Sequence, residues 1–197
     1  MTGTKNIIDI DLKKSILVES LEAFNQKGAK FTLDDLCKSL RISKKTIYTV
    51  FPGKEALLRE MIDEGFRRVK EEEGRIFHDG MLSTIEKIKK IIIVIPDSYQ
   101  RMDFRKFTSV KELYPEVYEI IVEHIEGGWD RTLELLEQGI QEGVLRKVSL
   151  PMVKTLIESA MEAFLLGKYP DEFNYLQALE EMMDIFMYGL INRENRV

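Results

Sequence analysis

Apolar residues recur at spacings of three and four along most of the chain, and this periodicity constrains the fold more than any other feature. Such positions collect on one face of an α-helix, which turns once every 3.6 residues. The first stripe consists of Leu12, Ile16, Leu17, Leu21 and Phe24. Gly28 follows it and is a typical C-terminal stop. The pattern predicts an all-α protein.

Two short helices are predicted next. Thr32 and Asp35 have the spacing of a capping box, so a helix is expected over residues 33–40. Ser43 is a suitable N-cap for a second helix, from Lys44 to about residue 50. The Phe-Pro-Gly sequence at 51–53 interrupts it, and a longer helix is expected from Lys54 to about residue 74.

Beyond residue 75 the helical segments lengthen. A stripe from Met81 to Ile95 ends at Pro96, and an aromatic-rich piece covers 99–111. One long helix is expected over 115–140, in which the glycines 127 and 128 allow a bend or a close helix contact. Two more helices are expected over 150–167 and 171–192. We predict an N-terminal domain at residues 1–55 and a second helical domain at residues 56–197.

Composition excludes several classes of protein. Of 197 residues, 44% are hydrophobic and 32% charged, which is typical of a globular chain. No apolar run approaches the roughly 20 residues of a membrane span, and the first residues lack a signal-peptide pattern. The single cysteine, Cys37, lies on an apolar helix face and is expected in the core. His78 and His124 lack metal-ligand spacing, so neither a metal nor a cofactor is predicted. We expect a cytoplasmic protein.

The net charge of −5 is unevenly distributed. Residues 1–60 carry 11 Lys and Arg against 8 Asp and Glu, and residues 61–197 carry 18 against 26. From residue 27 to 54 the balance is 7 basic against 2 acidic. A basic head could bind phosphates locally, although chance explains so small an excess equally well.

Two short helices between longer ones describe a helix-turn-helix, whose second helix enters the major groove of DNA. Here Ile47 and Phe51 can anchor that helix to the core. The remaining side chains suit phosphates and base edges: Lys44, Lys45, Thr46, Tyr48 and Thr49. Packing of Tyr48 against the first helix is the alternative for that residue.

The stretch from residue 16 to about 62 resembles the DNA-binding domain of the TetR/AcrR family of transcriptional regulators. The resemblance is carried by Ala23-Phe24, Lys27-Gly28, Thr32, Asp35-Leu36, Ile42-Ser43-Lys44, Thr46-Ile47-Tyr48, Phe51 and Lys54-Glu55-Ala56-Leu57. It implies DNA contacts at Thr32, Lys44, Thr46, Tyr48 and Lys54, with sequence readout at Lys45 and Thr49. Two residues depart from the family: Arg41 stands where glycine is common, and Val50 where tyrosine or histidine is common.

The resemblance also implies a bacterial, nucleoid-associated homodimer bound to double-stranded operator DNA, with a ligand-binding and dimerisation domain after the helix-turn-helix. Some residues could line an effector pocket, although the sequence favours plain core for each one taken alone: Phe104, Phe107, Tyr118, His124, Trp129, Met161 and Phe164. The last helix carries an apolar stripe broad enough for a partner as well as its own core: Leu176, Leu179, Met183, Phe186, Met187 and Leu190.

Three functions remain at this point. The leading one is a repressor released from its operator by a small, largely apolar ligand. The second is an activator or architectural DNA-binding protein without an effector. The third is an enzyme, which is disfavoured because the sequence shows no catalytic triad, phosphate loop, metal cluster or glycine fingerprint.

Overall fold

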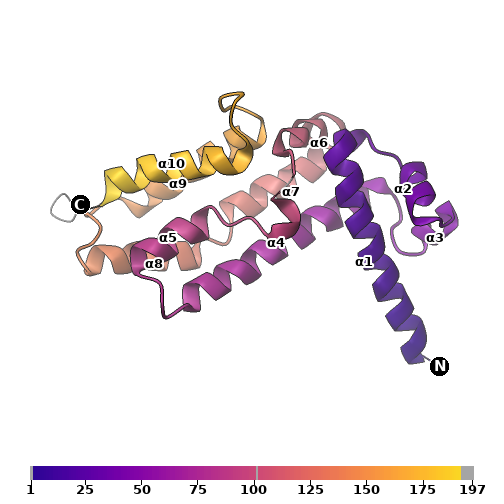
Figure 1. The fold of residues 1–197 in the computed structure, drawn as a ribbon, viewed down its shortest axis with the longest axis horizontal. Helices are drawn as coiled ribbons and strands as arrows, with labels where there is room; N and C mark the ends of the chain where they lie inside the picture. Colours follow the sequence, from indigo (N-terminus) through magenta and orange to yellow (C-terminus); the bar gives the residue numbers. More distant parts are fainter. Residues whose placement is uncertain (1, 101, 192–197) are drawn as a thin grey trace. The chain divides into compact units, whose positions relative to one another are not determined.

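The computed structural model describes residues 2–100 and 102–191, which are helical with short connections (Figure 1). Within these residues β-pairing is limited to one isolated bridge between Leu145 and Ile191. The all-α prediction is therefore confirmed. The chain divides into two compact units, residues 1–64 with 106–121 and residues 65–105 with 122–197. The division falls within two helices, α4 (Lys54–His78) and α7 (Pro115–Glu126).

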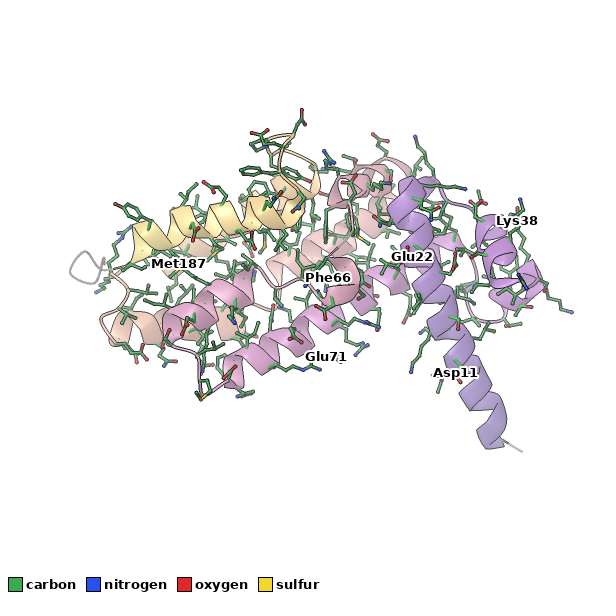
Figure 2. The ribbon with its side chains drawn as sticks, viewed as in Figure 1. Asp11, Glu22, Lys38, Phe66, Glu71 and Met187 are labelled. Atoms are coloured by element: carbon green, nitrogen blue, oxygen red, sulfur yellow. The ribbon has the colours of Figure 1, made fainter. Side chains whose placement is uncertain are left out.

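The first unit begins with a long helix and a helix-turn-helix. Its complete elements are α1 (Thr2–Lys27), η1 (Gly28–Lys30), α2 (Leu33–Leu40), α3 (Lys44–Tyr48) and α6 (Phe107–Leu113). Helix α2 packs on both α1 and α3 (Figure 1). The short helix η1 packs on α6. Charged side chains such as Asp11, Glu22 and Lys38 lie on the solvent-facing sides of α1 and α2 (Figure 2).

The helix boundaries in this unit follow the predicted caps. The Thr32 side chain accepts from the Asp35 amide, and the Asp35 carboxylate accepts from the Thr32 amide, which confirms the capping box. Ser43 caps α3 by accepting from the Thr46 amide at 3.1 Å. Gly28 ends α1 with a φ of +59°, a conformation that glycine adopts without a steric penalty. Local sequence therefore sets the ends of the first three helices.

The core of the first unit ties the short helices to the long ones. Its fully buried side chains include Ile16, Phe24, Phe31, Leu36, Ile47, Leu57 and Leu58. Ile47 of α3 is fully buried, and Phe51, just beyond α3, is 3% exposed. Both residues thus anchor the second helix of the helix-turn-helix, as predicted. Burial of each large apolar side chain contributes roughly 1.5–3 kcal/mol.

The second unit is a separate helical bundle. Besides parts of α4 and α7, it contains η2 (Asp97–Tyr99), η3 (Phe104–Lys106, shared at its last residue), α5 (Thr84–Ile92), α8 (Asp130–Gln141), α9 (Leu150–Leu165) and α10 (Tyr175–Leu190). Helix α5 packs along α8, and α9 along α10 (Figure 1). One core joins α5, α8, α9 and α10 through residues such as Ile88, Leu135, Ile157, Leu179 and Met187.

The single helix predicted over 115–140 is wrong, because the structure has two. Helix α7 ends at Glu126 and α8 begins at Asp130. Gly128 between them has a φ of +69°, which no residue inside a right-handed helix adopts. The aromatic-rich piece 99–111 is likewise divided among η2, η3 and α6.

No helix within the described residues is long and apolar enough to cross a membrane. The domain boundary predicted between residues 55 and 56 concerns DNA-binding and effector roles, and it stays a prediction. By packing alone, α6 and the first half of α7 belong with the helix-turn-helix.

Candidate nucleic-acid interface

Helix α3 presents polar side chains around one buried anchor. Ile47 is fully buried, whereas Lys44, Lys45 and Thr49 are exposed and Tyr48 is 51% exposed. About half of the Tyr48 side chain is therefore open to solvent. Thr49 donates to the Thr46 carbonyl at 2.6 Å and so closes the end of α3. A short helix with two ammonium groups and several hydroxyls on its exposed sides is suited to a polyanion.

Four of the seven predicted DNA-contact residues border the same open hollow of about 520 Å³. They are Thr32, Lys44, Tyr48 and Lys54, and they come from the start of α2, from α3 and from the start of α4. Lys45, Thr46 and Thr49 do not border it: Lys45 and Thr49 are exposed on α3, and Thr46 is half-buried against Ser43. The structure therefore separates the residues of the hollow from Lys45, Thr46 and Thr49 on α3.

The two lysines of the hollow are held differently. The Lys44 ammonium lies 2.9 Å from the Asp34 carboxylate, and this hydrogen bond raises the pKa of Lys44. The Lys54 ammonium donates to the Ala29 carbonyl at 2.5 Å, and burial lowers its pKa. Lys44 is thus an exposed cation with an exposed partner, whereas Lys54 is a partly desolvated cation on a neutral acceptor.

The first turn of α2 carries a second polar cluster next to the hollow. The Lys27 ammonium lies 2.8 Å from Asp35, and together with the Thr32 amide it lowers the pKa of Asp35 to about 2. Asp35 is therefore ionised at neutral pH and holds Thr32 in place. Its carboxylate acts in capping the helix rather than in contacting a polyanion, because like charges repel.

Seven residues that line the hollow were not among the predicted DNA contacts: Ala29, Lys30, Phe31, Leu33, Asp34, Leu113 and Tyr114, the last of which comes from the end of α6. Lys30 belongs to the basic stretch 27–54, so charge counting could have found it. Tyr114 carries no local signal, because α6 reaches the helix-turn-helix only through tertiary packing.

The proposed effector residues fall in different places. Phe107 and Tyr118 are buried in the first unit, where Phe107 packs on Phe24 with ring centres 5.1 Å apart. His124 stacks on Phe66 at 4.4 Å in the second unit. Met161 and Phe164 pack against the core of the second unit, as does Trp129, whose indole N–H donates to the Ile125 carbonyl. Phe104 stacks on Tyr175 and borders a hollow of about 280 Å³.

The proposed dimer residues on α10 are largely internal. Leu179, Met183, Met187 and Leu190 are buried in the core of the second unit (Figure 2 labels Met187). Phe186 and Leu176 are half-buried. The exposed apolar side chains of the last two helices are different ones: Met152, Leu156, Ile185 and Tyr188. On α10 the apolar stripe is continuous around much of the helix, so the sequence pattern did not single out Ile185 and Tyr188.

The cysteine, the histidine at the end of α4 and the turn residue Arg41 were also considered in the sequence. Cys37 is half-buried on α2. His78 lies at the end of α4 against the ring of Phe77. Within residues 2–100 and 102–191 no three His, Cys, Asp or Glu side chains come together to hold a metal ion. Arg41, in the turn between α2 and α3, has a φ of +55°, so the strain expected of a non-glycine residue there is present.

Comparison with known proteins agrees with this geometry. Residues 16–61 match the family model described as bacterial regulatory proteins, tetR family. The HTH-type transcriptional regulator YvaF of Bacillus subtilis (strain 168) is 23% identical over 181 residues, covering 91% of this chain and 95% of YvaF.

Solved structures of regulators share the fold. A TetR-family transcriptional regulator from Agrobacterium tumefaciens is similar with a TM-score of 0.72 and 12% identity, covering 93% of this chain and 100% of that one. SmeT, the repressor of the Stenotrophomonas maltophilia multidrug efflux pump SmeDEF, is similar with a TM-score of 0.67 and 16% identity, covering 94% and 93%. Residues 16–61 thus match the DNA-binding domain of the TetR family, and most of the chain is similar to a transcriptional regulator of the helix-turn-helix type.

Proposed function

We propose that this regulator is a cytoplasmic repressor that binds a palindromic operator as a homodimer and leaves it when a small, largely apolar ligand binds. The observation that carries the DNA-binding part is the hollow bordered by Thr32, Lys44, Tyr48 and Lys54. Hydroxyls and ammonium groups from three elements converge there, as recognition of a phosphate backbone requires. The proposal assigns the protein no reaction.

Two groups of residues divide the work of recognition in this proposal. Lys44, Tyr48 and Lys54 contact phosphates and fix the position of α3 in the major groove. Lys45 and Thr49, which are exposed outside the hollow, read base edges. A lysine suits guanine, and the threonine methyl suits thymine. Phosphate contacts supply affinity for any sequence, whereas base contacts supply the preference among sequences.

The repressor role is supported by SmeT, which shares the fold and is itself a repressor. The ligand part is supported by two open hollows in the second unit. The larger, of about 680 Å³, is lined by charged side chains such as Arg67, Glu71 and Arg75 together with the apolar Ile93, Ile95 and Leu176. The smaller is bordered by the stacked rings of Phe104 and Tyr175, which offer an apolar surface to a ligand.

Selection of bound fragments from random DNA tests the proposal, followed by titration of the enriched fragment with variants. Lys54→Ala should weaken binding to every sequence and reduce the dependence of affinity on salt by about one phosphate contact. Lys45→Ala and Thr49→Ala should change which bases are enriched, at about 1–3 kcal/mol for each contacted base pair. Lys38→Ala is the control, because Lys38 is exposed on α2 outside the hollow.

The same titration, repeated with a panel of apolar compounds, tests release. A true inducer binds the free protein more tightly than the DNA complex, by the same factor with which it weakens DNA binding. Enrichment of no palindrome, with unchanged affinity in Lys54→Ala, would contradict the DNA-binding assignment. A panel in which every compound binds both forms equally would contradict the ligand part alone.

A further inference from the structure

The ammonium group of Lys54 is held by three groups of the first unit. It donates to the Ala29 carbonyl at 2.5 Å, and it lies 4.6 Å from the ring centre of Phe31 and 5.3 Å from that of Tyr114. A cation over an aromatic face within about 6 Å is attracted by the negative face of the ring. Lys54 is therefore held in a defined position before any ligand arrives.

The same groups border the hollow described above. Phe31, Lys54 and Tyr114 line it together with Thr32, Lys44 and Tyr48. The rings attract the charge of Lys54, and the Ala29 carbonyl accepts one of its N–H groups. An ammonium group has three donors, so N–H groups remain for an anion entering the hollow.

Tyr114 is fixed by a segment far from the helix-turn-helix in sequence. It is the C-cap of α6, and its amide donates to the Val110 carbonyl at 2.8 Å. Helix α6 is in turn fastened to the end of α1. The Ser109 hydroxyl accepts from the Ala29 amide at 2.8 Å, and the Lys106 ammonium donates to the Gln26 carbonyl at 2.8 Å. The segment 106–114 thus places one aromatic wall around Lys54.

We propose that Tyr114 is a positioning residue for DNA binding, which holds the Lys54 ammonium where a backbone phosphate reaches it. The inference rests on the proposed function, since that function assigns Lys54 to a phosphate. A lysine side chain is long and flexible, and ordering it upon binding costs free energy. A side chain that is already ordered and partly desolvated avoids that cost.

A double-mutant cycle on Lys54 and Tyr114 tests the inference, with affinity for the selected DNA fragment measured over a range of salt concentrations. Lys54→Ala should weaken binding and reduce the salt slope by about one contact. Tyr114→Leu should weaken binding about three- to tenfold, whereas Tyr114→Phe, which keeps the ring, should bind like the wild type. In the Lys54→Ala background, Tyr114→Leu should cost less than about twofold, because the cation that it positions is gone.

The outcomes separate the two proposals. If Lys54→Ala alone leaves affinity and salt slope unchanged, the phosphate contact of the proposed function fails. Suppose instead that Lys54→Ala weakens binding. If Tyr114→Leu then changes the affinity equally in the wild type and in Lys54→Ala, or in neither, the positioning role of Tyr114 fails. Tighter binding by Tyr114→Leu would also overturn it, since the ring would then restrain Lys54. Melting curves accompany each variant, and Tyr114→Met replaces Tyr114→Leu in the cycle if the latter melts below the assay temperature.

Discussion

Arg41 occupies the left-handed region of backbone conformation, with φ 55° and ψ 40°. An L-residue pays a steric cost there because its Cβ approaches the carbonyl oxygen, and glycine does not. The residue is exposed at the end of α2, so its side chain is not needed for the core. Arg41→Gly should therefore raise the free energy of unfolding by about 0.5–1 kcal/mol. Urea denaturation followed by circular dichroism measures the change.

Arg41→Ala is the matched control for that prediction. It removes the same guanidinium but keeps a Cβ, so the strain remains and no stabilisation is expected. Equal stabilisation by alanine and glycine would show that charge, and not backbone strain, determines the effect.

Single residues of this chain were predictable where the interaction is local. The capping box of Thr32 and Asp35 and the Ser43 cap depend on neighbours within a few positions. The surroundings of Lys54 were not predictable in the same way. Ala29 lies 25 residues before it and Tyr114 lies 60 after it, so only the folded chain brings these groups together.

Gly128 separates α7 from α8, and both its backbone conformation and the space around it disfavour a larger residue. Its φ is +69°, and a Cβ placed there would lie 2.7 Å from Cε of Lys70. The Lys70 side chain cannot move freely, because its ammonium binds the Gly128 carbonyl at 2.9 Å and the carboxylate of the buried Glu73. Displacing it would leave Glu73 poorly compensated. Gly128→Ala should cost about 2–3 kcal/mol of stability.

Gly143 offers the comparison for the same measurement. It has a φ of +72°, and a Cβ placed there would meet no heavy atom within 4 Å. Gly143→Ala therefore reports the backbone cost alone, at about 1 kcal/mol. Denaturant midpoints for the two variants give the difference. Equal losses would mean that Lys70 relocates freely and that its contact with Glu73 does not stabilise the second unit.

For whole helices, apolar periodicity predicts that a helix exists better than it predicts the residues at which the helix begins and ends. The apolar spacing continues from Ile125 through Trp129 to Leu133, so it does not register the break between α7 and α8. The glycine pair was the only local signal, and glycines are also tolerated within helices at a cost of about 1 kcal/mol. The contact of Gly128 with Lys70, 58 positions away, fixes the break in space.

For the molecule as a whole, the sequence shows where apolar residues lie along a helix. It does not show whether the protein's own core buries them or whether they stay exposed for a partner. The stripe on α10 was expected to serve both a core and a partner. The structure assigns Leu179, Met183 and Met187 to the core of the second unit. Leu156 on α9 and Ile185 on α10 are left exposed at 48% and 66%. A hydropathy pattern does not distinguish these two groups, because both consist of the same residue types.

The prediction about the homodimer interface is based on these exposed side chains. The proposed homodimer would cover the exposed faces of the neighbouring helices α9 and α10, where Met152, Leu156 and Ile185 are at least 48% exposed. Leu156→Glu or Ile185→Glu would place an unpaired carboxylate in that interface, which is costly to bury. Because neither residue belongs to the core, the monomer should keep its helical content. Leu190→Glu, by contrast, should unfold the second unit, since Leu190 is only 6% exposed.

Sedimentation at micromolar concentration, with circular dichroism on the same samples, measures both effects. The wild type should sediment as a dimer, and Leu156→Glu as a folded monomer. Met81→Glu is the control, because Met81 is 92% exposed in the connection before α5, and it should remain dimeric. Loss of the dimer should also weaken binding to an operator with two half-sites far more than binding to a single half-site. The dimer links two DNA-binding domains, and this linkage raises the effective concentration of the second domain once the first is bound. A wild-type monomer, or a dimer that survives both Leu156→Glu and Ile185→Glu, would place the interface elsewhere.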